Sequence, residues 1–194
     1  KMTAPNSRYL TIHDLRQRID SGEVDTVVLA FTDMQGRLQG KRLHAQYFLD
    51  VALESGTEGC NYLLAVDIDM NTVAGYAISS WERGYGDMEF APDWATLRRL
   101  THLPATAMVQ CDLVWLDHSP VVESPRTILK HQLDQLAARD MVALAGTELE
   151  FIAFNTGYED AHRQRYQDLE PANQYNVDYS ILGTTRVEPL LRDI

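Results

Sequence analysis

The sequence has few cysteines, no long apolar run and no excess of basic residues, and each absence excludes a class of protein. The two cysteines, Cys60 and Cys111, are far apart and form no CxxC pattern, so we expect neither a disulfide framework nor a zinc site, and a cytoplasmic location fits best. There is no run of about 18 apolar residues and no apolar signal core at the N-terminus, so we expect no membrane span and no secretion. With 28 acidic and 17 basic side chains, the net charge of −11 argues against a nucleic-acid binder, which needs clustered Lys and Arg.

What is present is the composition of a globular protein, with 45% hydrophobic and 23% charged residues. The order of the predicted elements indicates an α+β fold in two parts, with a boundary at the turn cluster of residues 117–120. The first part, residues 8–117, mixes strands with short helices. Its predicted elements are helices at 11–19 and 44–53, a hairpin at 26–43, and strands at 62–69 and 107–116.

The second part, residues 118–194, begins with a helix that has Ser124 as its N-cap and Pro125 at its first helical position. The apolar face of this helix comprises Ile128, Leu129, Leu133 and Leu136. The later predicted elements are a single strand at 141–154 and helices at 158–166 and 186–194, the last without a stop signal. Because one strand cannot form a second core by itself, we expect the chain to be the N-terminal part of something larger.

The strand predicted at 141–154 carries two carboxylates in an apolar setting. Residues two apart in a strand project from the same face, roughly 6–7 Å apart, so Glu148 and Glu150 point the same way. A pair of this kind often lies on a solvated polar face. Here both faces of the strand are otherwise apolar, which is typical of a buried strand, and buried carboxylates need a partner or a metal. Carboxylate oxygens suit Mg²⁺ or Mn²⁺, so we expect a metal site at these two residues.

Four stretches of the chain together resemble the glutamine synthetase family in order and spacing. "GTELEFIAFN" is similar to the family's metal-binding strand, which has the pattern Gly-x-Glu-x-Glu-Phe. "VVLAFTDMQGRLQGKRL" resembles its first hairpin, "GDMEFAPD" its Ser-Asp-Met-x-Leu-x-Pro-Asp stretch, and "SPRTILKHQLDQL" its Pro-Arg helix. The resemblance implies a β-grasp N-terminal domain at residues 8–117, and the incomplete beginning of a catalytic α/β barrel at 118–194.

The resemblance also implies an activity, an ATP-dependent ligase that joins an amine to the γ-carboxylate of L-glutamate through γ-glutamyl phosphate. By position, Glu150 would hold the metal nearer glutamate and Glu148 the metal nearer ATP, while Tyr179 would line the amine pocket. The family's remaining ligands correspond to positions beyond Ile194, so this chain by itself is expected to be inactive. Family members assemble as double hexameric rings, which implies a homo-oligomer.

The stretch "EGCNYLL" at residues 58–64 departs from the family pattern Asp-Gly-Ser-Ser, whose aspartate helps to bind ammonium. This departure puts Cys60 roughly at the position of the aspartate. Loss of an anionic partner disfavours ammonium and favours a larger primary amine. The chain most resembles the actinobacterial members that make γ-glutamylamides from ethanolamine or polyamines, and its residues do not separate these two amines. Further residues that could shape the pocket are Asp67, Asp69, Trp81 and Glu82.

Two alternatives stay open at this point. One is a true glutamine synthetase that uses ammonium, and the other is a non-catalytic relative that acts as a regulator or assembly piece. The second is harder to reconcile with two glutamates in an apolar strand, because a protein without metals has little reason to keep them there.

Overall fold

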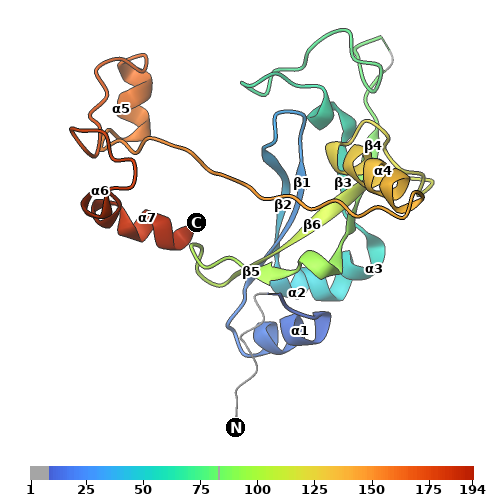
Figure 1. Cartoon of the computed structure of the whole chain (residues 1–194). Coiled ribbons are helices and arrows are strands. Elements are labelled where there is room, and N and C mark those ends of the chain that lie inside the picture. Colours follow the sequence, from blue (N-terminus) through green and yellow to red (C-terminus); the bar gives the residue numbers. More distant parts are fainter. Residues whose placement is uncertain (1–8, 83) are drawn as a thin grey trace. The chain divides into compact units, whose positions relative to one another are not determined.

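The computed structural model describes residues 9–82 and 84–194 (Figure 1). The expected start of the first domain at residue 8, the N-terminus without a signal core, and Arg83 lie outside the described residues. By their internal contacts the residues form two compact units, the first ending at Ala143 and the second running from Leu144 to Ile194. The domain boundary placed after residue 117 stays a prediction.

The first unit is built on one mixed sheet with the strand order β2-β1-β6-β4-β3, and β5 pairs with β6. The central pair, β1 and β6, is parallel, and every other pairing in the sheet is antiparallel. The predicted hairpin and the predicted strand at 107–116 are confirmed as β1, β2 and β6. The strand bounds are β1 Thr26–Thr32, β2 Leu38–His44, β3 Glu58–Cys60, β4 Asp87–Pro92, β5 Arg98–Arg99 and β6 Thr106–Trp115.

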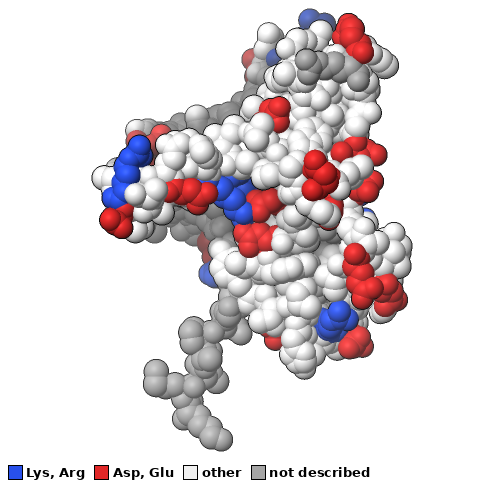
Figure 2. Space-filling model, turned by 90° about the vertical axis from the view of Figure 1, so that its right-hand side faces the viewer, with Lys and Arg blue, Asp and Glu red and all other residues white. Residues whose placement is uncertain are grey.

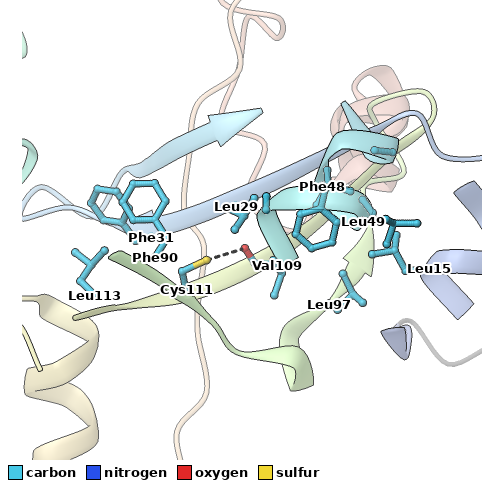
Figure 3. Close-up of a cluster of buried hydrophobic side chains, with 14 of the residues drawn as sticks. Leu15, Leu29, Phe31, Phe48, Leu49, Phe90, Leu97, Val109, Cys111 and Leu113 are labelled. Carbon is cyan, nitrogen blue, oxygen red and sulfur yellow. Dashed lines mark hydrogen bonds between the residues drawn. The ribbon is translucent and has the colours of Figure 1, made fainter. Parts of the chain in front are cut away.

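The core of this unit lies against the two central strands (Figure 3). Phe31 of β1 and Phe90 of β4 are both buried, and their ring centroids lie 5.1 Å apart. Phe48 is buried beside the indole of Trp94. Burial of each phenylalanine contributes about 1.5–3 kcal/mol. The strand β2, by contrast, is an edge strand and buries none of its side chains, which agrees with its polar sequence.

Two helical segments complete the core. The helix α1 (Ile12–Asp20) starts with a capping box, in which Thr11 and Asp14 each bind the backbone N–H of the other, and it buries Leu15 and Ile19. The predicted helix at 44–53 is confirmed as a continuous helical segment. It consists of α2 (Ala45–Tyr47), a π-helical turn η1 (Phe48–Ala52) and α3 (Leu53–Ser55).

The helix α4 (Pro125–Ala137) is attached to the sheet by charged side chains rather than by its apolar face. The guanidinium of Arg126 donates to Asp112 on β6 at 2.8 Å and forms an ion pair with Asp93 at the end of β4. Lys130 pairs with the same Asp112. The predicted apolar face of α4 is largely exposed, since Ile128, Leu129 and Leu133 are each more than 40% exposed.

Two predicted strands are absent from the structure. Residues 62–69 begin within a 3₁₀ turn, η2 (Asn61–Leu64), and continue as a loop. Hydrogen bonds join this stretch to distant residues, because Asn61 donates to the carbonyl of Ile78 and Gln35 donates to the carbonyl of Val66. Residues 141–152 are extended but exposed, and they pair with no strand among the described residues. A strand needs partners for its backbone hydrogen bonds, and an apolar pattern cannot show whether partners exist. The expected burial of Glu148 and Glu150 is therefore wrong for the structure of this chain.

The second unit contains three short helices, α5 (Tyr158–Arg163), α6 (Ile181–Arg186) and α7 (Glu188–Asp193). The helices predicted at 158–166 and 186–194 are present over the shorter ranges of α5 and α7, and α6 was not predicted from the sequence. The connecting segments are joined by a bridge between Phe154 and Pro171 and by hydrogen bonds between residues 153–156 and 170–172. Within residues 9–82 and 84–194, no helix is both long and apolar enough to cross a lipid bilayer.

Candidate functional site

Two neighbouring hollows in the first unit share Cys60 and Tyr62 in their linings. Cys60 is the last residue of β3, and Tyr62 lies in the 3₁₀ turn that follows. We call the first, lined mainly by aromatic side chains, the aromatic hollow, and the second, lined by Lys41, Glu58 and Asp87 among others, the charged hollow. Their volumes are about 240 Å³ and about 370 Å³, respectively. The lining of the aromatic hollow is Cys60, Tyr62, Thr72, Trp81 and Tyr85. The lining of the charged hollow includes Lys41, Glu58, Gly59, Cys60, Tyr62 and Asp87.

The walls of the aromatic hollow are rings that meet nearly at right angles. The centroids of Trp81 and Tyr85 lie 5.4 Å apart with an angle of 88° between the ring planes. Those of Tyr62 and Tyr85 lie 6.3 Å apart at 90°. Edge-to-face pairs of this kind are favourable for aromatic rings. Trp81 remains 81% exposed, so the hollow is open to solvent on the side of its indole.

Backbone packing at β3 places Cys60. A Cβ atom at Gly59 would lie 2.5 Å from the Cζ of Phe90, so only glycine lets β3 approach the core ring this closely. Gly59 pairs with Met88 and Cys60 with Asp87 in the β3–β4 ladder. The thiol of Cys60 is consequently held at the strand end, half-buried, between the two hollows.

The loop of residues 78–86, which carries Trp81 and Tyr85, is closed by one buried amide. Asn61 donates from Nδ2 to the carbonyl of Ile78 at 3.0 Å and from its backbone N–H to the carbonyl of Gly86 at 2.9 Å. Its Oδ1 accepts from the N–H of Gly86 at 3.3 Å. Asn61 thus ties both ends of the loop to the strand end. Sequence reasoning missed this residue, although an asparagine beside Cys60 in an apolar stretch was a signal for it.

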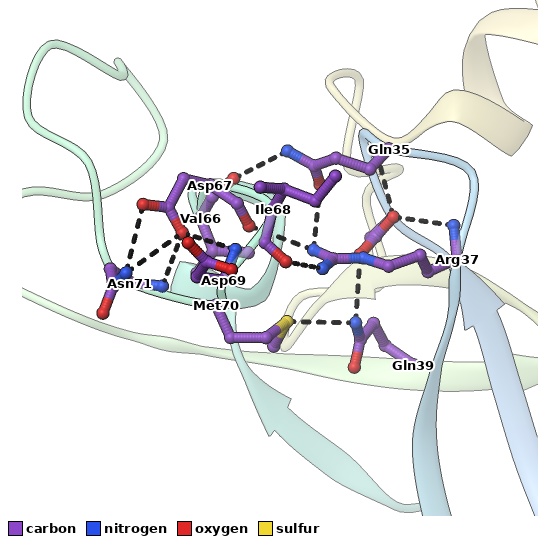
Figure 4. A network of polar contacts seen from close by, with 10 residues as sticks. Gln35, Arg37, Gln39, Val66, Asp67, Ile68, Asp69, Met70 and Asn71 are labelled. Atoms are coloured by element: carbon purple, nitrogen blue, oxygen red, sulfur yellow. Dashed lines mark hydrogen bonds and ion pairs between the residues drawn. The ribbon is translucent and has the colours of Figure 1, made fainter. Parts of the chain in front are cut away.

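The loop of residues 66–71 is held by the turn between β1 and β2 (Figure 4). Gln35 donates to the carbonyl of Val66 at 2.8 Å, and the guanidinium of Arg37 donates to the carbonyls of Asp67 and Ile68. Arg37 is itself fixed by Asp33, whose side chain is buried. The polar turn therefore anchors a loop that is about thirty residues away in sequence.

Asp33 remains ionised although it is buried. Burial, the largest influence, acts to raise the pKa of this carboxyl group. Hydrogen bonds from the Gln39 side chain, from the backbone and side chain of Arg37, and from the Gln35 backbone act against it, and together they hold the pKa below its usual value of 3.8. A buried carboxylate with several donors is a rigid structural anchor rather than a proton carrier.

The residues expected to shape the pocket divide into two groups. Trp81 lines the aromatic hollow, whereas Asp69 and Glu82 line neither hollow. Asp67 instead accepts hydrogen bonds from the backbone N–H and side-chain amide of Asn71 and from the backbone N–H of Asp69, and these bonds, those from Asn71 above all, lower the pKa of its carboxyl group. Its carboxylate is therefore used inside its own loop.

A carboxylate is present close to Cys60. When Gly59 is matched with the glycine of the Asp-Gly-Ser-Ser pattern, Glu58 rather than Cys60 occupies the position of the aspartate. Glu58 lies in the lining of the charged hollow together with Asp87. The strand end therefore keeps a carboxylate next to Cys60.

Glu148, Glu150 and Tyr179 lie in the second unit, whereas Cys60 lies in the first. Both glutamates are exposed on the unpaired segment, and the Tyr179 side chain is fully exposed at a backbone φ of 57°. The chemistry of the two carboxylates suits a hard cation. The donors of this chain are nevertheless too few, because the described residues contain no group of three or more His, Cys, Asp or Glu side chains placed to hold a metal.

Comparison with known proteins places the chain in a family. It is 62% identical over 185 residues to the γ-glutamylethanolamide synthetase of Streptomyces coelicolor, an alignment that covers 95% of this chain and 40% of that protein. It is 29% identical over 180 residues to a glutamate–isopropylamine ligase of a Pseudomonas species, with 93% and 39% covered. The chain belongs to the glutamine synthetase family. The family resemblance inferred from the motifs is confirmed.

A solved structure of a glutamine synthase homologue matches the fold with a TM-score of 0.51 at 20% identity, covering 75% of this chain and 35% of that one. This likeness supports the mixed α+β fold of the glutamine synthetase family, and at this identity it concerns the fold alone. No protein-family model matches the chain. The chain spans about 40% of the length of the curated relatives that it matches.

Proposed function

We propose that this chain is the amine-facing, N-terminal portion of an ATP-dependent ligase that joins a primary amine to the γ-carboxylate of L-glutamate. The observation that carries the proposal is the 62% identity to a γ-glutamylethanolamide synthetase along almost the whole chain. The hollows beside Cys60 support it, because an aromatic wall next to carboxylates suits an organic ammonium ion.

In the proposed reaction, a γ-carboxylate oxygen of glutamate takes the terminal phosphoryl group of ATP and releases ADP. The amine nitrogen then attacks the carbonyl carbon of γ-glutamyl phosphate, phosphate leaves, and the nitrogen loses a proton. A bound Mg²⁺ or Mn²⁺ would offset the charge on the transferring phosphoryl group. Glu148 and Glu150 would supply carboxylate oxygens to such ions, together with ligands from outside this chain. Tyr179 would line the amine site.

The proposal accounts for the apolar surface that this chain leaves exposed. We infer that residues 8–117 form the β-grasp domain and that residues 118–194 begin a catalytic barrel. Further strands would pair with residues 141–154 and cover the apolar face of α4. The family's double hexameric ring is the expected assembly of the complete protein. The 194-residue chain by itself is expected to turn over no substrate.

One observation favours a second candidate, a glutamine synthetase that uses ammonium. Glu58 lies in the lining of the charged hollow and matches the ammonium-binding aspartate when the glycines are aligned. A carboxylate there would still pair with a small cation. A third candidate is a non-catalytic relative that acts as a regulator or assembly piece.

The test is release of ADP by the complete protein with glutamate, Mg²⁺ and one amine from a panel of ammonium, ethanolamine, isopropylamine, putrescine and spermine. Turnover with an organic amine and little with ammonium is the expected result. Turnover with ammonium alone would establish the second candidate. Silence with every amine would support the third.

A matched pair of variants tests the glutamates. Glu150→Gln is expected to abolish turnover and to weaken Mn²⁺ binding measured by electron paramagnetic resonance. Glu159→Gln, an exposed carboxylate on α5, is the control and is expected to change neither. Equal Mn²⁺ binding by wild type and Glu150→Gln would refute the metal assignment.

A further inference from the structure

Side chains of the turn between β1 and β2 contact the loop of residues 66–71 at several positions (Figure 4). The contacts run from Gln35 to the carbonyl of Val66, from Arg37 to the carbonyls of Asp67 and Ile68, and from Gln39 to the sulfur of Met70. Because the acceptors on the first three loop residues are backbone carbonyl oxygens, these contacts fix the path of the chain itself. The loop cannot shift without the loss of several hydrogen bonds at once.

The ends of this loop meet beside the aromatic hollow. Val66 and Thr72 form an antiparallel bridge, and the N–H of Val73 donates to the carbonyl of Ala65 at 3.0 Å. Val66 is buried, whereas Thr72 lines the hollow. Gln35 therefore holds the residue that pairs with Thr72, and one wall of the hollow is connected to the turn through a single intervening residue.

Geometry rather than charge alone directs the guanidinium of Arg37. The chain has a net charge of −11, and acidic side chains are spread over the face shown in Figure 2, where basic ones are fewer. A cation held by charge alone can pair with any exposed carboxylate nearby. Arg37 instead donates from Nε to the buried Asp33 carboxylate at 2.8 Å and from its terminal nitrogens to the loop carbonyls. The planar fork of a guanidinium fixes the direction of these donors.

We propose that Gln35 and Arg37 are positioning residues that determine which size of amine the aromatic hollow accepts. They line neither hollow and act through the loop, because the loop holds the Thr72 wall in place. The inference rests on the proposed function, since it takes the amine to occupy this hollow. It adds that selectivity is controlled from a turn about thirty residues away from the loop in sequence.

A fixed wall and a mobile wall select amines differently. An apolar pocket distinguishes ligands that differ by one methylene by about 10- to 200-fold, provided that its walls stay in place. A wall that moves outward makes room for the additional group, so this discrimination falls. Release of the loop is therefore expected to change the ratio between two amines rather than to lower activity uniformly.

The experiment measures kcat/KM of the complete protein for two amines, the amine of the panel with the highest turnover and its analogue with an added methyl group. For ethanolamine, the analogue is 1-amino-2-propanol. Wild type is expected to prefer the smaller amine. Gln35→Met and Arg37→Met are each expected to reduce this preference roughly 10-fold, with the KM values for glutamate and ATP unchanged. Arg37→Lys is expected to retain part of the preference, because an ammonium group can still donate to one carbonyl.

Gln46→Met is the matched control. Gln46 is exposed on α2, and its side chain bonds to Asp50 rather than to the loop, so the preference is expected to stay as in wild type. Arg37→Met also removes the cation that pairs with buried Asp33, which lowers the stability of the fold. Gln35→Met leaves this ion pair in place, so it tests the inference even where Arg37→Met does not fold. Circular dichroism at the assay temperature establishes which variants are folded.

Three results would overturn the inference. The first is a preference that stays unchanged in the folded variants of Gln35 and Arg37, or that falls equally in Gln46→Met. The second is a wild type that uses both amines equally, because there would then be no selectivity to set. The third is a rise in the KM values for glutamate and ATP as large as that for the amine, which would show a general loosening of the protein.

The proposed function and this inference fail in different ways. Turnover of an organic amine with a preference that no variant changes would support the ligase and remove the positioning role. Absence of turnover with every organic amine in wild type would remove the organic-amine ligase itself, and the positioning role with it.

Discussion

Replacement of Asp33 by alanine tests whether the buried network at the β1–β2 turn holds the loop of residues 66–71. The Asp33 carboxylate accepts hydrogen bonds at 2.9 Å from the N–H groups of Gln35 and Arg37, at 2.8 Å from Arg37 Nε and at 3.0 Å from Gln39 Nε2. Removal of one partner from a buried ion pair costs about 3–5 kcal/mol. The Arg37 side chain is 31% exposed and can regain water, so we expect a loss of about 2–4 kcal/mol.

The assay is urea denaturation at neutral pH, together with amide hydrogen exchange of residues 67–71. Asp33→Ala is expected to lower the urea midpoint without changing the slope and to speed exchange in this loop. Asp69→Ala, an exposed carboxylate of the same loop, is the control and is expected to stay within about 0.5 kcal/mol of wild type. A loss below about 1 kcal/mol for Asp33→Ala, or exchange that is unchanged in the loop, would refute the reasoning.

The pH dependence follows from the same carboxylate. Because the folded pKa of Asp33 lies below the usual value of 3.8, the group stabilises the fold fully at higher pH, and this contribution is lost as the pH falls below that value. Asp33→Asn is expected to flatten the acid limb of the stability profile. An identical acid limb in wild type and Asp33→Asn would contradict the lowered pKa.

Three further predictions concern packing and reactivity. Gly40→Ala is expected to prevent stable folding, because the new Cβ would lie 1.9 Å from the carbonyl oxygen of Leu29, and residue 40 has a backbone φ of 150°. The measurement is thermal denaturation, in which the variant is expected to show no unfolding transition. A normal melting curve would refute this prediction. Burial raises the pKa of the Cys111 thiol to about 12. A thiol reagent at pH 8 is therefore expected to label Cys60 alone in the native protein and both cysteines in urea. Labelling of Cys111 in the native protein would contradict its burial. Arg126→Met leaves the carboxylates of Asp93 and Asp112 without their guanidinium partner. It is expected to lower the unfolding free energy by about 1–3 kcal/mol, measured by urea denaturation. An unchanged midpoint would show that α4 is held by other contacts.

The elements that were predicted correctly are those whose signals are contiguous in sequence. The capping box at Thr11 and the apolar spacing of Leu15 and Ile19 lie within one helix, so no distant residue was needed to find it. The hairpin at 26–43 combines a β-rich run with a turn at Gly36, whose φ of 83° suits glycine. The family motifs were equally local and led to the family that the comparisons support.

The candidate site was predicted only in part. Cys60 and Trp81 were named from the sequence, and both line the aromatic hollow. Tyr85 and the buried clamp Asn61 were missed, since their roles depend on contacts between the strand end at residue 61 and a loop that begins 17 residues later. A pattern in sequence does not show which loop folds back onto which strand.

The amino-acid sequence by itself determined most of the helices, the hairpin, the family and the choice of Glu148 and Glu150 as metal-ligand candidates, because these depend on residue type and short spacing. It did not predict α6. The tertiary structure alone decided that residues 62–69 bend into a turn, that Asp33 is buried and ionised, and that three aromatic rings meet beside Cys60. It also decided that Glu148 and Glu150 are exposed here. The physical reason is the same in each case: burial and strand pairing depend on partners that are distant along the chain, and the free energy of those contacts overrides the local pattern.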